Sequence, residues 1–338
     1  MHLFSLPKIV SDLKERGIGF SFLFNVSPKM LQHELLVFLS KSQTPSLNGL
    51  FSIESNLTSP DLLDLSGWFR DADGYKKYVL GFLGNDTDEI NQFAHSMWNS
   101  ISTPLQFMIG KLENIQAAAV ICASGPSLDQ SITWLKQNQD KVVIFASGSS
   151  LGCLLANKIR PRFAVILEMS HIIYDDLLSF VESGYSLEGI TLIAPPTIDP
   201  RIMPMFEKTC IFHRPLSSTM AFFKSEMDSA LIQAGPQAAN AAFESAMKIG
   251  FKKCILLGCD FSGPSPLDQR ASKAIGESER TLNIPAQGRK GSTVFSSVDL
   301  SVTAQMFQAA LDYFTPDCYS TPQGIHLDGI TVLSSISD

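Results

Sequence analysis

Short apolar runs alternate with longer segments of helical spacing from about residue 115 onward. Runs such as AAAVICAS, KVVIFAS and RFAVILE are continuously apolar over most of their length, which is typical of strands buried on both faces of a sheet. The predicted strands are residues 117–124, 141–147, 162–168, 190–195, 208–213 and 252–260, and the predicted helices are residues 127–140, 149–159, 174–182, 240–250 and 297–314. This alternation predicts an α/β fold: a Rossmann-like, mostly parallel sheet with helices on both faces.

The pattern divides the chain into three parts. Residues 1–85 hold two apolar runs on either side of a helical stretch and predict a small N-terminal α/β domain. Residues 86–114 begin after a Gly-Asn turn signal and predict a helical connector with a break at its Thr-Pro step. Residues 115–338 predict the Rossmann-like domain, in which the polar segment 262–296 indicates a lid, a binding loop or disorder.

Composition narrows the class of protein. The 338 residues carry a formal net charge of −7 without a dense run of Lys and Arg, which argues against a nucleic-acid partner. None of the six cysteines belongs to a CxxC pair, so a reducing compartment is favoured over a disulfide or zinc framework. The N-terminus has no signal-like apolar region and no window is long and apolar enough to span a bilayer, so we expect a cytoplasmic protein without a membrane span.

The loop Ser124-Gly125-Pro126-Ser127 stands where the first strand of this domain meets its first helix. Ligands of open α/β sheets bind outside the carboxyl ends of the strands. Gly125 allows the backbone to approach a ligand, and Ser127 with Gln130 forms an S-x-x-Q capping box, so the helix start offers N–H groups to a phosphate. The alternative is a well-capped turn without a ligand. The loop matches neither GxGxxG nor a P-loop, which disfavours NAD and P-loop chemistry.

The next strand ends in a similar way, in Ser147-Gly148-Ser149-Ser150. Small and hydroxyl-bearing residues leave room for a base or a ribose and offer hydrogen bonds to it. Helix capping explains the same residues equally well.

Titratable residues follow several predicted strands at this edge. Glu168 and Asp260 each end a strand, and two carboxylates beside a phosphate suit Mg²⁺. Alternatively one of them accepts the ribose hydroxyls, or both cap helices and loops. His171, His213 and Asp260 are the candidate catalytic residues, because transfer to a hydroxyl needs a base. Further candidates, as a base or as cations that neutralise phosphate, are His326, Arg214, Arg289 and Lys290.

Five ordered segments carry a resemblance to a known family. They are ASGPSLD at 123–129, ASGSSLGCLLANKIRPRFAVILE at 146–168, AGPQAANAAFESAMKIGFKKCILLGCDFS at 234–262, GRKGSTVFSS at 288–297 and STPQGIHLDGI at 320–330. Together they resemble the flagellar motility accessory factors, whose central domain is shared with archaeal-type 6-hydroxymethylpterin diphosphokinases. The first segment is also similar to the nucleotide loop of bacterial sialyltransferases that use CMP-sugars.

The resemblance implies a glycosyltransferase that moves a nonulosonic, sialic-acid-like sugar from its CMP carrier to Ser or Thr of a flagellin-like protein. Under it, Gly125, Pro126 and Ser127, with Ser124 beside them, hold the CMP phosphate or ribose. The same resemblance implies that Ser147 lines the base and ribose. Gly148 is implied in the same role, and Asn240 and Asp260 are implied to face the same cleft.

The sequence departs from the family pattern at three positions. The family's Asp before the third strand is Arg162, the Asp at the end of that strand is Glu168, and a hydroxyl residue near Asn240 is Gln237. Glu168 and Gln237 are retained as nucleotide-binding candidates. Two alternatives remain open: a Mg²⁺-dependent pyrophosphokinase that acts on a hydroxymethylpterin, and a nucleotide-binding module without catalysis.

Overall fold

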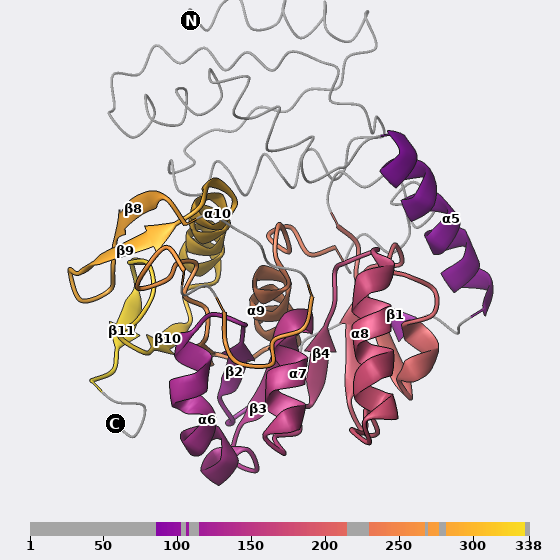
Figure 1. The fold of residues 1–338 in the computed structure, drawn as a ribbon, viewed down its shortest axis with the longest axis horizontal. Coiled ribbons are helices and arrows are strands. Elements are labelled where there is room, and N and C mark those ends of the chain that lie inside the picture. Colours follow the sequence, from indigo (N-terminus) through magenta and orange to yellow (C-terminus); the bar gives the residue numbers. More distant parts are fainter. Residues whose placement is uncertain are drawn as a thin grey trace, which may run out of the picture.

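A nine-stranded sheet forms the centre of the computed structural model (Figure 1). The structure describes residues 86–102, 106–107, 115–214, 230–267, 270–276 and 282–334, and the N-terminal domain predicted for residues 1–85 lies outside them. The strands of the sheet are β1 (Gln106–Phe107), β2 (Ala119–Cys122), β3 (Val143–Ser147), β4 (Phe163–Val165), β5 (Thr191–Ala194), β6 (Lys208–Ile211), β7 (Lys253–Leu257), β10 (Asp317–Ser320) and β11 (Ile330–Val332). Every neighbouring pair is parallel, so the predicted Rossmann-like α/β fold is confirmed.

Helices cover both faces of this sheet, in front of it and behind it in Figure 1. The front face carries α6 (Ser127–Asn138), α7 (Gly148–Ala156) and α8 (His171–Glu182), and the other face carries α9 (Ala238–Ile249) and α10 (Val298–Phe314). Side chains alternate between the two faces along each strand. In β3, Ile144 and Ala146 join the core under α6, α7 and α8, whereas Phe145 joins the core under α9 and α10. Burial on both faces explains why the strands are continuously apolar.

The order of the strands creates a switch point at β2. The sheet runs β1-β6-β5-β4-β3-β2-β7-β10-β11, so the chain moves outward from β2 to β6 and then returns to β7 on the other side of β2. Cys122, near the end of β2, lies beside Ala146 of β3 and Leu257 of β7. Loops that leave neighbouring strands in opposite directions open a crevice, which is where open α/β sheets bind their ligands.

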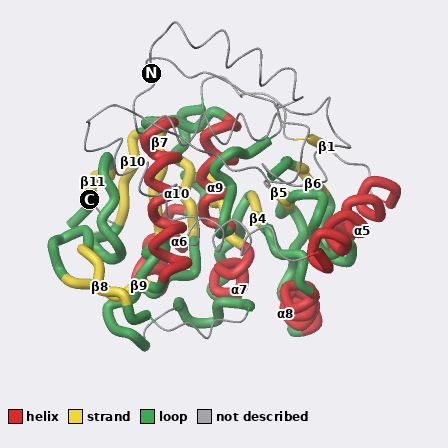
Figure 2. Tube along the Cα trace, turned by 90° about the horizontal axis from the view of Figure 1, so that it is seen from above, coloured by secondary structure: helices red, strands yellow, loops and turns green. Residues whose placement is uncertain are grey.

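Several edge elements differ from the sequence-based prediction. The segment predicted as a lid, a binding loop or disorder contains an antiparallel hairpin of β8 (Ile284–Gln287) and β9 (Thr293–Ser296). The prediction of a helical connector is wrong at β1, which is a strand that pairs with β6. The paired strands β10 and β11 were not predicted. Strands β8, β10 and β11 are short and only partly buried, so they lack the apolar run that marks a central strand. The hairpin and α5 (Asp86–Ser102) lie at opposite ends of the sheet (Figure 2).

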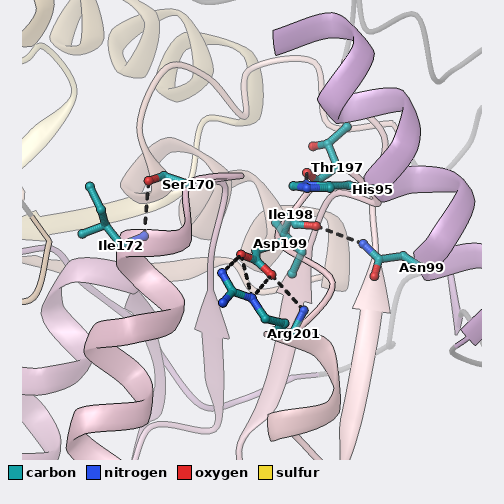
Figure 3. Close-up of polar contacts among 8 residues, drawn as sticks. All are labelled: His95, Asn99, Ser170, Ile172, Thr197, Ile198, Asp199 and Arg201. Carbon is teal, nitrogen blue, oxygen red and sulfur yellow. Dashed lines mark hydrogen bonds and ion pairs between the residues drawn. The ribbon is translucent and has the colours of Figure 1, made fainter. Parts of the chain in front are cut away.

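Helix α5 is attached to the sheet domain through its polar side (Figure 3). The side-chain amide of Asn99 donates to the carbonyls of Pro196 and Ile198 at 2.9 and 3.0 Å, and His95 Nδ1 lies 3.2 Å from the carbonyl oxygen of Thr197. Its large apolar side chains face outward: Ile90, Phe93, Met97, Trp98 and Ile101. Among the described residues, every helix is too short or too polar to cross a membrane.

Asn99→Ala tests how α5 is attached. The side chain is 1% exposed, so its loss leaves two carbonyl groups without their donor. We expect the free energy of unfolding to fall by about 2 kcal/mol, measured by urea denaturation. Asn91→Ala, an exposed position of the same helix, is the control and should leave stability unchanged. Equal stability of the two variants would mean that the amide does not hold the helix.

Candidate functional site

A cavity of about 330 Å³ opens at the carboxyl edge of the sheet, beside the switch point. Its walls come from the loops after β2, β3, β4 and β7, from the starts of α7 and α9, and from residues 270–276. Six of the predicted nucleotide-binding residues line it: Ser124, Gly125, Ser147, Gly148, Glu168 and Gln237. The chain thus brings segments 113 residues apart, such as Ser124 and Gln237, to one ligand-sized space.

Ser127 and Asp260 are joined to each other rather than exposed in this cavity. The Ser127 hydroxyl donates to Asp260 Oδ1 at 2.6 Å and its backbone N–H donates to Oδ2 at 2.8 Å. Both residues are buried, and neither belongs to the cavity lining. The positive end of α6 is therefore already occupied by the chain's own Asp260 carboxyl group.

The predicted capping box is wrong. Helix α6 begins at Ser127 after an N-cap at Pro126, and this N-cap residue makes no side-chain capping bond. The Ser127 hydroxyl points to Asp260 instead, and Gln130 accepts a hydrogen bond from the Gln323 side chain. Pro126 lies outside the cavity lining as well, so Ser124 and Gly125 are the residues of this loop that face the cavity.

Gly125 is required by the neighbouring loop as well as lining the cavity. Its N–H donates to the carbonyl of Gly258 at 2.8 Å. A Cβ at this position would lie 2.5 Å from Asp260 Oδ2 and 2.5 Å from the Gly258 oxygen, which no side chain tolerates. The close approach that the sequence predicted toward a ligand is thus, in the structure, an approach between the loops after β2 and β7.

Burial and the neighbouring groups act in opposite directions on the pKa of Asp260. The side chain is 2% exposed, and this burial raises the pKa of its carboxyl, while the Arg289 guanidinium and the hydrogen bonds from Ser127 act in the opposite direction. Arg289 is buried too, and it donates to Ser320 Oγ and to the Cys259 carbonyl, both at 2.7 Å. Arg289, one of the cations predicted to neutralise phosphate, therefore connects the segment between β8 and β9 and the C-terminal strands to the switch point.

The first turns of α7 and α9 face the cavity from opposite faces of the sheet. Ser147 and Gln237 are the N-caps, and neither makes a side-chain capping bond. The first N–H groups of a helix have no partner within the helix, and the helix dipole makes this end positive. Hydroxyl groups fix the α7 start: Ser149 Oγ donates to Ser124 Oγ at 2.9 Å, and Ser150 Oγ donates to the Cys122 carbonyl at 2.8 Å. These two helix starts suit an anionic group.

The remaining predicted residues are dispersed. Asn240 is fully buried and donates to the Thr303 carbonyl at 3.3 Å, so it connects α9 to α10 and does not line the cavity. His171 is exposed at the start of α8, between two lining residues. His213 is 1% exposed and follows β6, which three strands separate from β2, and burial lowers its pKa to about 4. His326 is exposed and lies 3.3 Å from Asp328 Oδ1.

Glu168 is the one carboxylate in the cavity lining that the structure describes. Both oxygens of Asp260 accept hydrogen bonds from Ser127, so the pair of carboxylates suggested for Mg²⁺ is not formed. No group of three or more His, Cys, Asp or Glu side chains suited to a metal ion occurs within the described segments.

Sequence reasoning missed the contribution of residues 270–276. Arg270, Ile275 and Gly276 line the cavity, and none of them was singled out within segment 262–296, for which the sequence predicted a lid, a binding loop or disorder. The contacts of residues 270–276 with α6 and α8 join positions 143 and 100 residues apart, which local sequence patterns do not reveal.

Glu244 holds the segment that leads into α9. Its carboxylate accepts the N–H groups of Ile232 at 2.8 Å and of Gln233 at 2.6 Å. The side chain is fully buried, and this burial raises its pKa from 4.5 to about 7, while Lys248 and the two hydrogen bonds oppose the rise.

Comparison with known proteins identifies a matching family and a similar fold. Residues 91–265, more than half of the chain, match the family described as "6-hydroxymethylpterin diphosphokinase MptE-like". A search of curated proteins gives no match. The fold is similar to that of the Maf glycosyltransferase from Magnetospirillum magneticum AMB-1, with a TM-score of 0.70 and 24% identity over 98% of this chain. The chain spans 50% of the length of that protein.

Asp260→Asn tests the bond between the two central loops. An amide cannot accept from both Ser127 donors, and the change leaves Arg289 without the nearby negative charge. We expect a loss of about 3 kcal/mol in the free energy of unfolding, measured by urea denaturation. Asp317→Asn, on an exposed position of β10, should have wild-type stability. Wild-type stability of Asp260→Asn itself would contradict the structural role.

Glu244→Gln should change how stability depends on pH. Between pH 4.5 and about 7 the folded protein retains a proton on Glu244 that the unfolded chain has released, so this group's stabilisation, complete below pH 4.5, is lost as the pH rises to about 7. Wild-type stability should fall relative to the variant by up to about 3 kcal/mol across this window. Glu182→Gln, at an exposed position, is the control in the same denaturation series. Parallel pH profiles for wild type and Glu244→Gln would contradict a raised pKa.

Proposed function

Since the chain belongs to the 6-hydroxymethylpterin diphosphokinase MptE-like family, we propose that it is a glycosyltransferase of the motility-accessory type. It takes a sialic-acid-like sugar from a CMP donor and passes it to Ser or Thr of a flagellin-like protein. The observation that carries the proposal is the cavity at the switch point, which is lined by hydroxyl groups and by the starts of α7 and α9. Its volume of about 330 Å³ falls in the range of pockets that bind small ligands.

The charges around the cavity favour a CMP-sugar over a nucleoside triphosphate. Arg270 is the one cation among the described lining residues, and its guanidinium donates to the carbonyls of Ile275 and Gly276 at 2.6 Å. The helix starts supply a modest positive potential, suited to one phosphodiester. Transfer of a diphosphate from ATP requires Mg²⁺ and several cationic partners, and the lining offers Glu168 alone as a carboxylate.

The proposed reaction replaces one bond at the anomeric carbon of the sugar. The acceptor hydroxyl oxygen bonds to this carbon, the bond from the carbon to the phosphate oxygen breaks, and CMP leaves with the electron pair. The hydroxyl proton passes to a base at the cavity rim, where Glu168 and His171 are exposed. The α7 and α9 starts stabilise the charge on the leaving phosphate. His213 is a poor base, because burial lowers its pKa to about 4.

We place this reaction in the cytoplasm. All six cysteines are free thiols, and five of them are buried. Free thiols fit a reducing compartment. The Maf glycosyltransferase that shares this fold is about twice as long.

Binding of CMP by the full chain tests the proposal. In titration calorimetry we expect CMP to bind more tightly than ATP with Mg²⁺. Gln237→Ala removes a lining side chain at the start of α9 and should weaken CMP binding about tenfold. Gln305→Ala, exposed on α10, is the matched control and should bind as wild type does.

Two results would overturn the proposal. Tighter binding of ATP with Mg²⁺ would favour a pyrophosphokinase that acts on a hydroxymethylpterin. CMP binding without release of CMP from a CMP-sialic acid donor in the presence of flagellin would favour a nucleotide-binding module without catalysis.

A further inference from the structure

Residues 270–276 cross the carboxyl edge of the sheet as a strap over the cavity. The N–H of Ala271 donates to the Ser124 carbonyl at 2.8 Å, and the N–H of Ile275 donates to the Ser149 carbonyl at 3.0 Å. The strap therefore touches the loop after β2 and the first turn of α7, the two predicted nucleotide-binding segments. Arg270, Ile275 and Gly276 form part of the cavity wall.

Two carboxylates outside the cavity lining hold the strap, one at Ser272 and one at its last residue, Gly276. Asp129 of α6 accepts from the Ser272 N–H at 2.9 Å and from the Ser272 hydroxyl at 2.8 Å. Asp176 of α8 accepts from the Gly276 N–H at 2.6 Å. Because α6 and α8 lie on either side of α7 (Figure 1), these bonds stretch the strap across α7. Bonds to ionised carboxylates are stronger than neutral ones.

The strap lies directly on α7, without space between them. A Cβ added at Gly152 would lie 2.6 Å from Cγ2 of Ile275 and 2.7 Å from the carbonyl oxygen of Lys273. Ile275 is 5% exposed, so its side chain is held between α7 and the cavity. The position of Ile275 is therefore determined by its contact with Gly152 of α7 and by the bonds that Asp129 and Asp176 make to the strap.

We propose that Asp129 and Asp176 are positioning residues for donor binding, because together they fix the strap that closes one wall of the cavity. The inference rests on the proposed function for the identity of the donor. The two carboxylates act through Ile275 and Arg270, which reach the cavity, and they do not touch the donor themselves. Release of the strap removes this wall from the bound donor and leaves the rim groups Glu168 and His171 in place.

The test compares the double variant Asp129→Ala/Asp176→Ala with Asp140→Ala/Asp175→Ala. The control removes exposed carboxylates close to the same positions, one just after α6 and one on α8. For the double variant we expect the Kd of CMP and the KM of a CMP-sugar donor to rise about tenfold, with kcat and the KM of the acceptor unchanged. The single variants should show smaller rises, and Asp129→Asn/Asp176→Asn provides an isosteric version with less effect on folding.

Trypsin gives a second readout that is independent of activity. It cleaves after Arg270 and Lys273, and both lie in the strap. Mass spectrometry should detect faster cleavage at these two bonds in the double variant than in the control, and saturating CMP should slow cleavage of the wild type. A change of global stability alone would accelerate cleavage throughout the chain.

Two outcomes separate this inference from the proposed function. Wild-type CMP affinity in the double variant, with the wild type binding CMP, would overturn the role of the two carboxylates and leave the proposed function intact. Absence of CMP binding by the wild type would overturn the proposed function and, with it, the positioning role for a CMP donor.

Discussion

The hydrogen bonds between the buried Asp260 carboxylate and Ser127 join the two central loops of the carboxyl edge. They connect the loop after β7 to the first residue of α6 across the switch point, at 2.6 and 2.8 Å. Gly125 and Gly258 make the contact close enough, because a side chain at either position would collide with the facing loop. Arg289 adds the hairpin and the C-terminal strands to the same point through Ser320 and the Cys259 carbonyl. The shape of the neighbouring cavity depends on this junction, since its floor is built from the same loops.

The same junction determines where an anionic ligand can be held. The Asp260 carboxyl group already occupies the start of α6, so this helix end is less available to a phosphate than its sequence suggests. The starts of α7 and α9 face the cavity instead, at Ser147-Gly148 and at Gln237. The conspicuous Gly-Pro-Ser loop therefore acts mainly as structural support, and the second loop together with the α9 start is better placed to meet an anionic ligand.

Local patterns in the sequence predicted the central part of the fold. The continuously apolar strands and the helices between them were identifiable, because strands that are buried on both faces leave a direct trace in the sequence. The edge strands β10 and β11 were missed, since short, half-buried strands have no such trace. The capping box failed for a different reason: Ser127 matched a local motif, but its partner is Asp260, 133 residues away. The strap shows the same limit, with 143 residues between Asp129 and Ser272.

The charge balance of the cavity supports a ligand with little charge. Two of the cations that the sequence offered for phosphate binding are accounted for: Arg289 is buried among protein groups, and Lys290 is exposed outside the lining. Arg270 lies in the lining, but its guanidinium is bound to carbonyl groups of its own strap. Each helix start contributes roughly half of a positive charge, so α7 and α9 together offer about one. A single phosphodiester matches this supply, and a triphosphate exceeds it severalfold unless a metal ion contributes. Under the proposed function, the carboxylate of the sugar needs a partner of its own, and Arg270 is the one cation among the described lining residues.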